Sequence, residues 1–293
     1  MILQLLISGI SLGSVYALIA VGFAVVFSNM KFSNFAHGGM ISACAYIGFY
    51  FQRAFTEPPH VFVTMLFTAL CGIALALFID FVAYRKIRQK KAPNLYYFLA
   101  SITFAILIEQ ILNVFFGKNT YAYPPIFAEN IFTIGSLRVA SIDALILGVS
   151  LVILTLLLLV MNKTKIGLAI RTVAINPETS RLMGINSNMV ITAVFVIAGA
   201  LAGFSGVLLG AKYTVYPSLG QSMMIKGFTA SVIGGLGSLG GAIAAAVMLG
   251  VVEIYLTYFF GALVTPIFTF GIMLIFLAVR PEGIAGRFAK VKV

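Results

Sequence analysis

Nine long apolar stretches, separated by short polar segments, constrain this chain more than any other feature. They cover residues 2–28, 36–52, 61–84, 95–116, 142–161, 188–211, 221–235, 238–259 and 263–279. A helix needs about 20 apolar residues to cross a bilayer, and continuous runs favour helices over strands. Charged residues make up 9% of the chain, whereas soluble domains carry about 25%. The sequence therefore predicts an all-α integral membrane protein, a polytopic bundle in one transmembrane domain over residues 1–293.

Two of the nine stretches are weak. The second begins in the polar segment 29–34 and is short, and the seventh is short and contains Lys226. Broken or re-entrant helices are tolerated in a membrane only where they face protein or a water-filled cavity. We therefore expect about 8–9 transmembrane helices with short or re-entrant segments, and we expect those segments to mark a transport path.

The basic residues indicate how the chain is oriented. Thirteen of the 19 Lys and Arg lie within 85–91, 163–181 and 280–292, each beside an apolar stretch. This clustering is typical of cytoplasmic loops, so the net charge of +11 indicates anionic lipid as a neighbour rather than nucleic acid. Nine full crossings would place the N-terminus outside, and a re-entrant second segment would place it inside. The charges leave both arrangements open.

Catalytic and metal-binding patterns are missing from the sequence. Cys44 and Cys71 lie inside apolar runs, and His37 and His60 are isolated, so no set of ligands has the spacing of a zinc site. Neither a G-x-S-x-G elbow nor a GxxxxGK[ST] phosphate loop occurs. The glycine run 234–241 is interpreted as a tight turn between two helices at the inner surface.

Small residues mark one helix face in the sixth stretch. Gly199, Gly203, Gly206 and Gly210 are spaced four, three and four residues apart, which places them on one side of a helix. Such a stripe lets a neighbouring helix approach closely. We therefore assign these glycines to helix packing.

A short helix is predicted inside the polar loop 162–187. Asn176 is a good N-cap, Pro177 fits the first turn and Glu178 complements the helix dipole, while Gly184 would end the helix. The predicted segment, 177–183, either rests on lipid or docks on a cytoplasmic partner. Its chemistry alone does not choose between the two.

Placing an ionisable side chain inside the membrane costs free energy, so such a side chain within an apolar stretch indicates a functional role. Glu109 and Glu253 are expected at similar depth in the outer half of the membrane, with Lys226 near them. The alternative for the two carboxylates is a structural ion pair or hydrogen bond between helices. Asp143 falls near the end of a stretch and is interpreted as a residue that snorkels or caps.

Seven segments together form a recognisable pattern. They are Ser11 to Leu18, Asn34 to Gly38, Ala174 to Asn186, Ala198 to Gly203, Lys226 to Ala230, the glycine run 234–241, and Arg280 to Ile284. Each segment alone is a weak signal, but their order and spacing are specific and extend over nearly the whole chain. In this pattern the chain resembles the membrane permeases of the branched-chain amino acid class of ABC importers.

The resemblance implies a transport subunit of a bacterial or archaeal plasma (inner) membrane, without enzymatic activity or a cofactor of its own. Its partners would be a second permease (a related chain or a copy of itself), two cytoplasmic ATPase subunits that hold ATP and Mg, and an extracytoplasmic substrate-binding protein. The cargo implied is an amino acid, with a branched-chain one favoured and with urea, amides or another small polar solute as alternatives. A proton-coupled secondary transporter using Glu109 or Glu253 is a further alternative.

The resemblance also implies roles for individual residues. Helix 177–183 would be the coupling helix, so the residues expected to couple to the ATPase are Arg171, Asn176, Pro177, Glu178, Arg181, Leu182 and Gly184. Apart from the resemblance, our hypothesis is that a mildly polar translocation path is lined by polar groups around Asn34, His37, Glu109, Lys226, Thr229 and Glu253.

Overall fold

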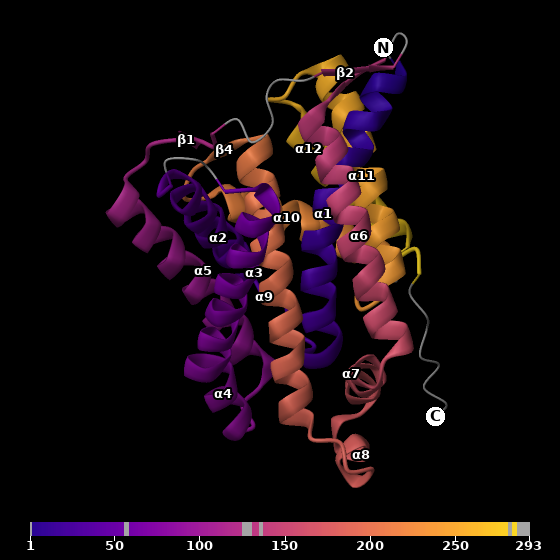
Figure 1. Cartoon of the computed structure of the whole chain (residues 1–293). Coiled ribbons are helices and arrows are strands. Elements are labelled where there is room, and N and C mark those ends of the chain that lie inside the picture. The colour runs from indigo at the N-terminus through magenta and orange to yellow at the C-terminus, as the bar shows by residue number, and fades with distance from the viewer. Residues whose placement is uncertain (1, 56–58, 125–130, 135–136, 281–282, 286–293) are drawn as a thin grey trace.

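A computed structural model describes residues 2–55, 59–124, 131–134, 137–280 and 283–285. Helices account for most of these residues (Figure 1). The predicted basic tail residues Arg287, Lys290 and Lys292 lie outside the described ranges.

All nine apolar stretches form helices. These are α1 (Ile2–Met30), α2 (Ala36–Arg53), α3 (Val61–Ile79), α5 (Asn94–Phe116), α6 (Ser141–Lys163), α9 (Ser187–Lys212), α10 (Leu219–Gly234), α11 (Leu239–Phe260) and α12 (Thr265–Val279). Within the described ranges, six helices are long and apolar enough to cross a membrane: α1, α5, α6, α9, α11, and the helix that α3 begins and that continues to Gln89. The prediction of an all-α, polytopic membrane protein is confirmed.

The remaining elements are short. The helix of α3 continues through a π-helical turn, η1 (Asp80–Tyr84), into α4 (Arg85–Gln89), and α7 (Lys165–Ile175) and α8 (Pro177–Leu182) lie between α6 and α9. Two antiparallel strand pairs occur outside the apolar stretches: β1 (Tyr121–Ala122) with β4 (Thr214–Val215), and β2 (Ile131–Ile134) with β3 (Leu137–Ala140). Sequence patterning did not predict these pairs, because strands this short leave no periodicity to detect.

Helix α1 is the centre of the bundle. Its side chains are almost fully buried from Ser11 to Val26, and it packs against α6, α9, α10 and α11. The approach of α11 is close enough that a Cβ added at Gly13 would lie 2.6 Å from the Cα of Val247. Glycine is therefore required at this crossing.

The glycine stripe of α9 meets three neighbours. A Cβ added at Gly199 or Gly203 would lie 2.5 Å from backbone atoms of α3, and one at Gly206 would lie 2.8 Å from backbone atoms of α2. A Cβ at Gly210 would meet the ring of Tyr123 at 2.4 Å. The stripe lets two helices and one loop residue pack directly on the α9 backbone.

The two ends of the molecule differ in composition. The N-terminus and β2 lie at one end, and α4, α7 and α8 lie at the opposite end (Figure 1). The second end carries the basic segments 85–91 and 163–181, so it is the cytoplasmic end by the positive-inside rule. On this assignment α1 starts at the outer end, which is one of the two arrangements that the charges leave open.

Candidate functional site

The chain is unwound where α1 meets α2. Residues 31–35 are not helical, and the side chain of Asn34, 1% exposed, accepts a 2.8 Å hydrogen bond from the hydroxyl of Tyr84. The N–H of Phe35 donates to Ser101 Oγ at 3.2 Å. A π-helical turn often shifts a side chain at a functional position, and here it places Tyr84 against the unwound segment.

Buried polar atoms without partners gather beside this break. His37 is 1% exposed, and within the described part of the chain neither of its ring nitrogens has a hydrogen-bond partner. The same holds for Oε1 of Gln221 on α10, which lies 2.6 Å from the position of a Cβ added at Gly38. Buried polar groups without a protein partner are rare in folded proteins. Thr229 is different, because its hydroxyl donates to the carbonyl of Ile225 in its own helix.

A buried ion pair joins α10, α11 and α1. The ammonium of Lys226 donates to the carboxylate of Glu253 and to the hydroxyl of Tyr16 at 3.0 Å. The Tyr16 hydroxyl in turn donates to Glu253 Oε2 at 3.1 Å. The Lys226 side chain keeps 24% of its surface exposed, against 11% for Glu253. Lys226 and Glu253 are therefore neighbours, as their predicted depths indicated.

A second ion pair lies further toward the outer end of α1. Lys212, at the end of α9, donates to Asp143 Oδ1 at 2.7 Å, and Ser11 and Ser8 donate to the same carboxylate at 2.9 and 3.3 Å. The interpretation of Asp143 as a snorkelling or capping residue is wrong, because the residue is 9% exposed and paired. Sequence reasoning missed Lys212, although both residues fall at outer ends of stretches.

Glu109 does not join either pair. It lines an outer cavity of about 610 Å³ whose polar lining residues are Glu109, Gln110, Asn113, Lys118, Thr120, Tyr216 and Ser218. The hydroxyls of Tyr216 and Ser222 lie 3.3 Å apart, which links this cavity to the face of α10, one turn from Lys226. Among the described residues, no hydrogen bond or ion pair connects Glu109 with Lys226 or Glu253.

Tyr213 lies near both acidic residues of the ion pairs. Although the residue is 38% exposed, desolvation of its hydroxyl, with Glu253 and Asp143 close by, raises the pKa of that hydroxyl above the usual value. The tyrosine therefore stays neutral.

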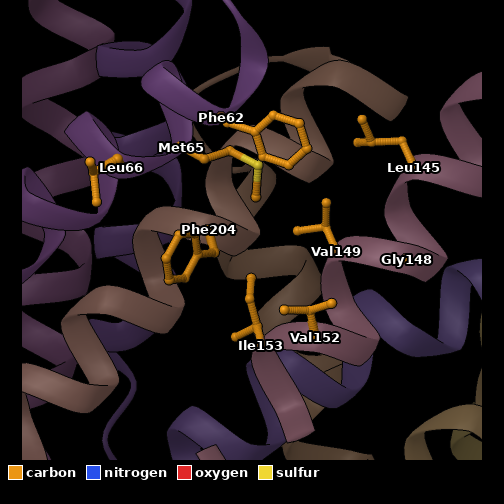
Figure 2. Close-up of a pocket in the computed structure, with 9 residues that line it drawn as sticks. All are labelled: Phe62, Met65, Leu66, Leu145, Gly148, Val149, Val152, Ile153 and Phe204. Carbon is orange, nitrogen blue, oxygen red and sulfur yellow. The ribbon is translucent and has the colours of Figure 1, made fainter. Parts of the chain in front are cut away.

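An apolar pocket of about 590 Å³ lies between α3, α6 and α9 (Figure 2). Its lining consists of Phe62, Met65, Leu66, Leu145, Gly148, Val149, Val152, Ile153 and Phe204. No polar side chain lines it, so it cannot replace the hydration of a charged solute. The outer cavity, which has polar lining residues, suits a polar solute better.

Helix α8 lies at the cytoplasmic tip of the molecule (Figure 1). Asn176 Oδ1 accepts hydrogen bonds from the N–H groups of Glu178 and Thr179 at 2.9 and 3.1 Å, and Gly184, with φ +80°, follows the helix end. The predicted helix 177–183 is confirmed to within one residue. Leu182 is 87% exposed, and Glu178 and Arg181 are also exposed.

Arg171 occupies a different place. It lies on α7 and lines a pocket with the end of α1, whereas the other residues expected to couple to an ATPase lie on α8 or beside it.

The family model described as branched-chain amino acid transport system / permease component matches residues 5–277. The chain belongs to this family. This permease is therefore a multi-pass membrane protein with a transport role rather than an enzyme.

Three relatives illustrate the match. The high-affinity branched-chain amino acid transport system permease protein BraD of Pseudomonas aeruginosa is 32% identical, over 97% of the permease and 96% of BraD. The corresponding protein LivH of Escherichia coli K12 is 31% identical, with the same coverage of each chain. A probable LivH of Methanocaldococcus jannaschii is 26% identical over 92% of the permease and 88% of that protein.

One solved structure shares the fold. It is a chain of PsaBC from Streptococcus pneumoniae in complex with Fab, with a TM-score of 0.51 over 95% of the permease and 91% of that chain, at 14% identity.

Among the residues that the structure describes, no group of three or more His, Cys, Asp or Glu could hold a metal ion.

Proposed function

We propose that this permease is the membrane subunit of an ATP-driven importer of branched-chain amino acids in a bacterial or archaeal inner membrane. It forms half of the translocation path together with a second permease, either a related chain or a copy of itself. The names of BraD and LivH support the cargo.

The observation that supports the proposed translocation path is a series of polar side chains along the outer part of α10. The route begins in the cavity that contains Glu109 and Lys118, passes Tyr216 and Ser222, and reaches the pair Lys226–Glu253. A zwitterionic cargo presents one ammonium and one carboxylate, so groups of both signs along the route can replace its hydration. Their partial exposure keeps each contact weak, and weak contacts allow release.

A second part of the path is proposed at the break before α2. Asn34 and His37 line this part of the path. The unpartnered nitrogens of His37 and the amide oxygen of Gln221 provide hydrogen-bonding groups for cargo or water. Helix α10 connects the two regions, because it carries Gln221, Lys226 and Thr229.

Helix α8 is the proposed site of coupling to the ATPase. Its exposed Leu182 and Arg181 suit a groove that is partly apolar and partly acidic, while Asn176, Pro177 and Gly184 fix the helix ends. ATP and Mg bind in two partner ATPase subunits, and closure of those subunits moves α8. The bundle then alternates between outward- and inward-open arrangements as packed bodies.

The test is uptake of labelled leucine into proteoliposomes that hold the permease, its second permease and the ATPases, with an extracytoplasmic binding protein added. We expect uptake that requires ATP, and we expect Glu178→Ala/Arg181→Ala to keep ATP hydrolysis while losing uptake. Lys165→Ala, on the exposed surface of α7, is the matched control. Uptake that follows a proton gradient without ATP would instead establish a secondary transporter, and unchanged coupled uptake in the double variant would overturn the role of α8.

A further inference from the structure

A second polar cavity lies at the cytoplasmic end and has no part in the proposed path. This inner-end pocket, of about 960 Å³, is lined by Ser28, Lys31, Asn162, Arg171, Ala174, Ile175, Gly235, Leu236, Gly237, Ser238 and Ala285. The ends of α1 and α6, the second half of α7 and the turn between α10 and α11 form its wall. The glycine run 234–241 thus borders a cavity as well as connecting two helices.

Among the residues that the structure describes, the charged groups lining the inner-end pocket are all positive. Lys31 and Arg171 line it, and no described acidic residue does. Of the described acidic residues, Asp80, Asp143 and Glu253 pair with cations elsewhere. Glu109 lines the outer cavity, and Glu178 lies on α8. Two cations that share a concave site favour an anion between them.

The backbone adds to this positive potential. The N-terminus of α11, a helix of 22 residues capped by Ser238, borders the inner-end pocket, and a helix N-terminus carries about half a positive elementary charge. Within the described residues, the N–H groups of Leu236 and Gly237 have no hydrogen-bond acceptor. Gly237, with φ +94°, gives the turn a conformation that other residues rarely adopt.

Lys31 is held in place by an unusual backbone conformation. Its φ is +57°, a left-handed value that costs energy for a residue with a side chain. Its N–H donates to the carbonyl of Phe27 at 2.8 Å, and its own carbonyl accepts from Asn94 at 3.3 Å. These two hydrogen bonds fix the backbone from which the Lys31 side chain extends to line the pocket.

The position of the inner-end pocket along the membrane normal and the apolar side chains at its edge indicate which anion it binds. Asn162 and Ser28 lie within three residues of the ends of two membrane helices, which is the level of lipid headgroups. The exposed apolar side chains of Ile175 and Leu236 flank the two cations and suit the glycerol and upper acyl region of a lipid. Basic pockets between helices on the cytoplasmic side bind anionic headgroups. We propose that the inner-end pocket binds the phosphate of an anionic phospholipid of the cytoplasmic leaflet.

The test measures lipid binding to the purified full-length permease by native mass spectrometry, with phosphatidylglycerol against phosphatidylcholine. We expect a preference for phosphatidylglycerol that Lys31→Gln/Arg171→Gln weakens at least about tenfold, since each variant removes a charge-assisted contact. Lys165→Gln removes an exposed charge from the same helix α7 outside the pocket and should keep the preference. Thermal unfolding followed with a thiol-reactive dye at buried Cys44 verifies that each variant is folded.

Three results would overturn the proposal. The preference could survive in the double variant, or Lys165→Gln could reduce it equally, which would indicate general surface charge. Glycerol phosphate, which lacks acyl chains, could bind as tightly as the lipid, and the occupant would then be a soluble phosphate. None of these results depends on transport, so the proposed importer function is tested separately.

Discussion

The pair Lys226–Glu253 gives the sharpest energetic prediction. Removing one partner of a buried pair leaves an unpaired charge and costs about 3–5 kcal/mol. Because the Lys226 side chain keeps 24% exposure, we expect the lower end, about 3 kcal/mol, for either Lys226→Met or Glu253→Leu. Replacing both residues removes both charges, so the double variant should lose less stability than either single variant.

The assay is reversible unfolding in mixed micelles, followed by the helical circular dichroism signal. Tyr16→Phe is the matched variant. It keeps the ion pair and removes two hydrogen bonds, so we expect a loss of about 1–3 kcal/mol. The reasoning fails if the single effects add in the double variant, because additivity would mean that the two side chains do not interact. In the transport assay, the double variant should be folded but slow, since the proposed path has lost both charges.

Further predictions concern packing, the second ion pair and the helix cap. Gly203→Leu should abolish folding, because even a Cβ would lie 2.5 Å from the Cα of Ala69; the yield of monodisperse protein checks this. Asp143→Asn should cost about 3 kcal/mol in the same unfolding assay, and a change below 1 kcal/mol would contradict a buried pair. Asn176→Ala should cost about 1 kcal/mol of local helix stability, which hydrogen exchange of the amides of Glu178 and Thr179 would report, while exchange in α7 stays unchanged.

The fold could be predicted from the sequence because the membrane fixes helix length. Every apolar stretch had to span the hydrocarbon or pack within the bundle, so each became a helix near its expected ends. The helix at 177–183 was predictable for a local reason, since Asn176, Pro177 and Gly184 set its ends with little help from the rest of the chain.

Side-chain neighbours were only partly predictable. Depth along the membrane normal follows from residue position, so Lys226 and Glu253 could be placed at one level. The same argument also placed Glu109 there, but depth does not say which helices are adjacent, and α5 packs against α2 rather than α11. Predicting the pair Asp143–Lys212 would have required knowing that α6 and α9 both pack against α1.

The arrangement around α1 sets a condition on any conformational cycle. Tyr16 ties this helix to one ion pair, and Ser8 and Ser11 tie it to the other. A helix enclosed on most sides cannot shift without repacking its neighbours, so we expect α1 to stay in place during a conformational cycle. The Lys226–Glu253 pair joins α10 to α11, so a displacement of either helix relative to the other would open this pair and leave Asp143–Lys212 closed.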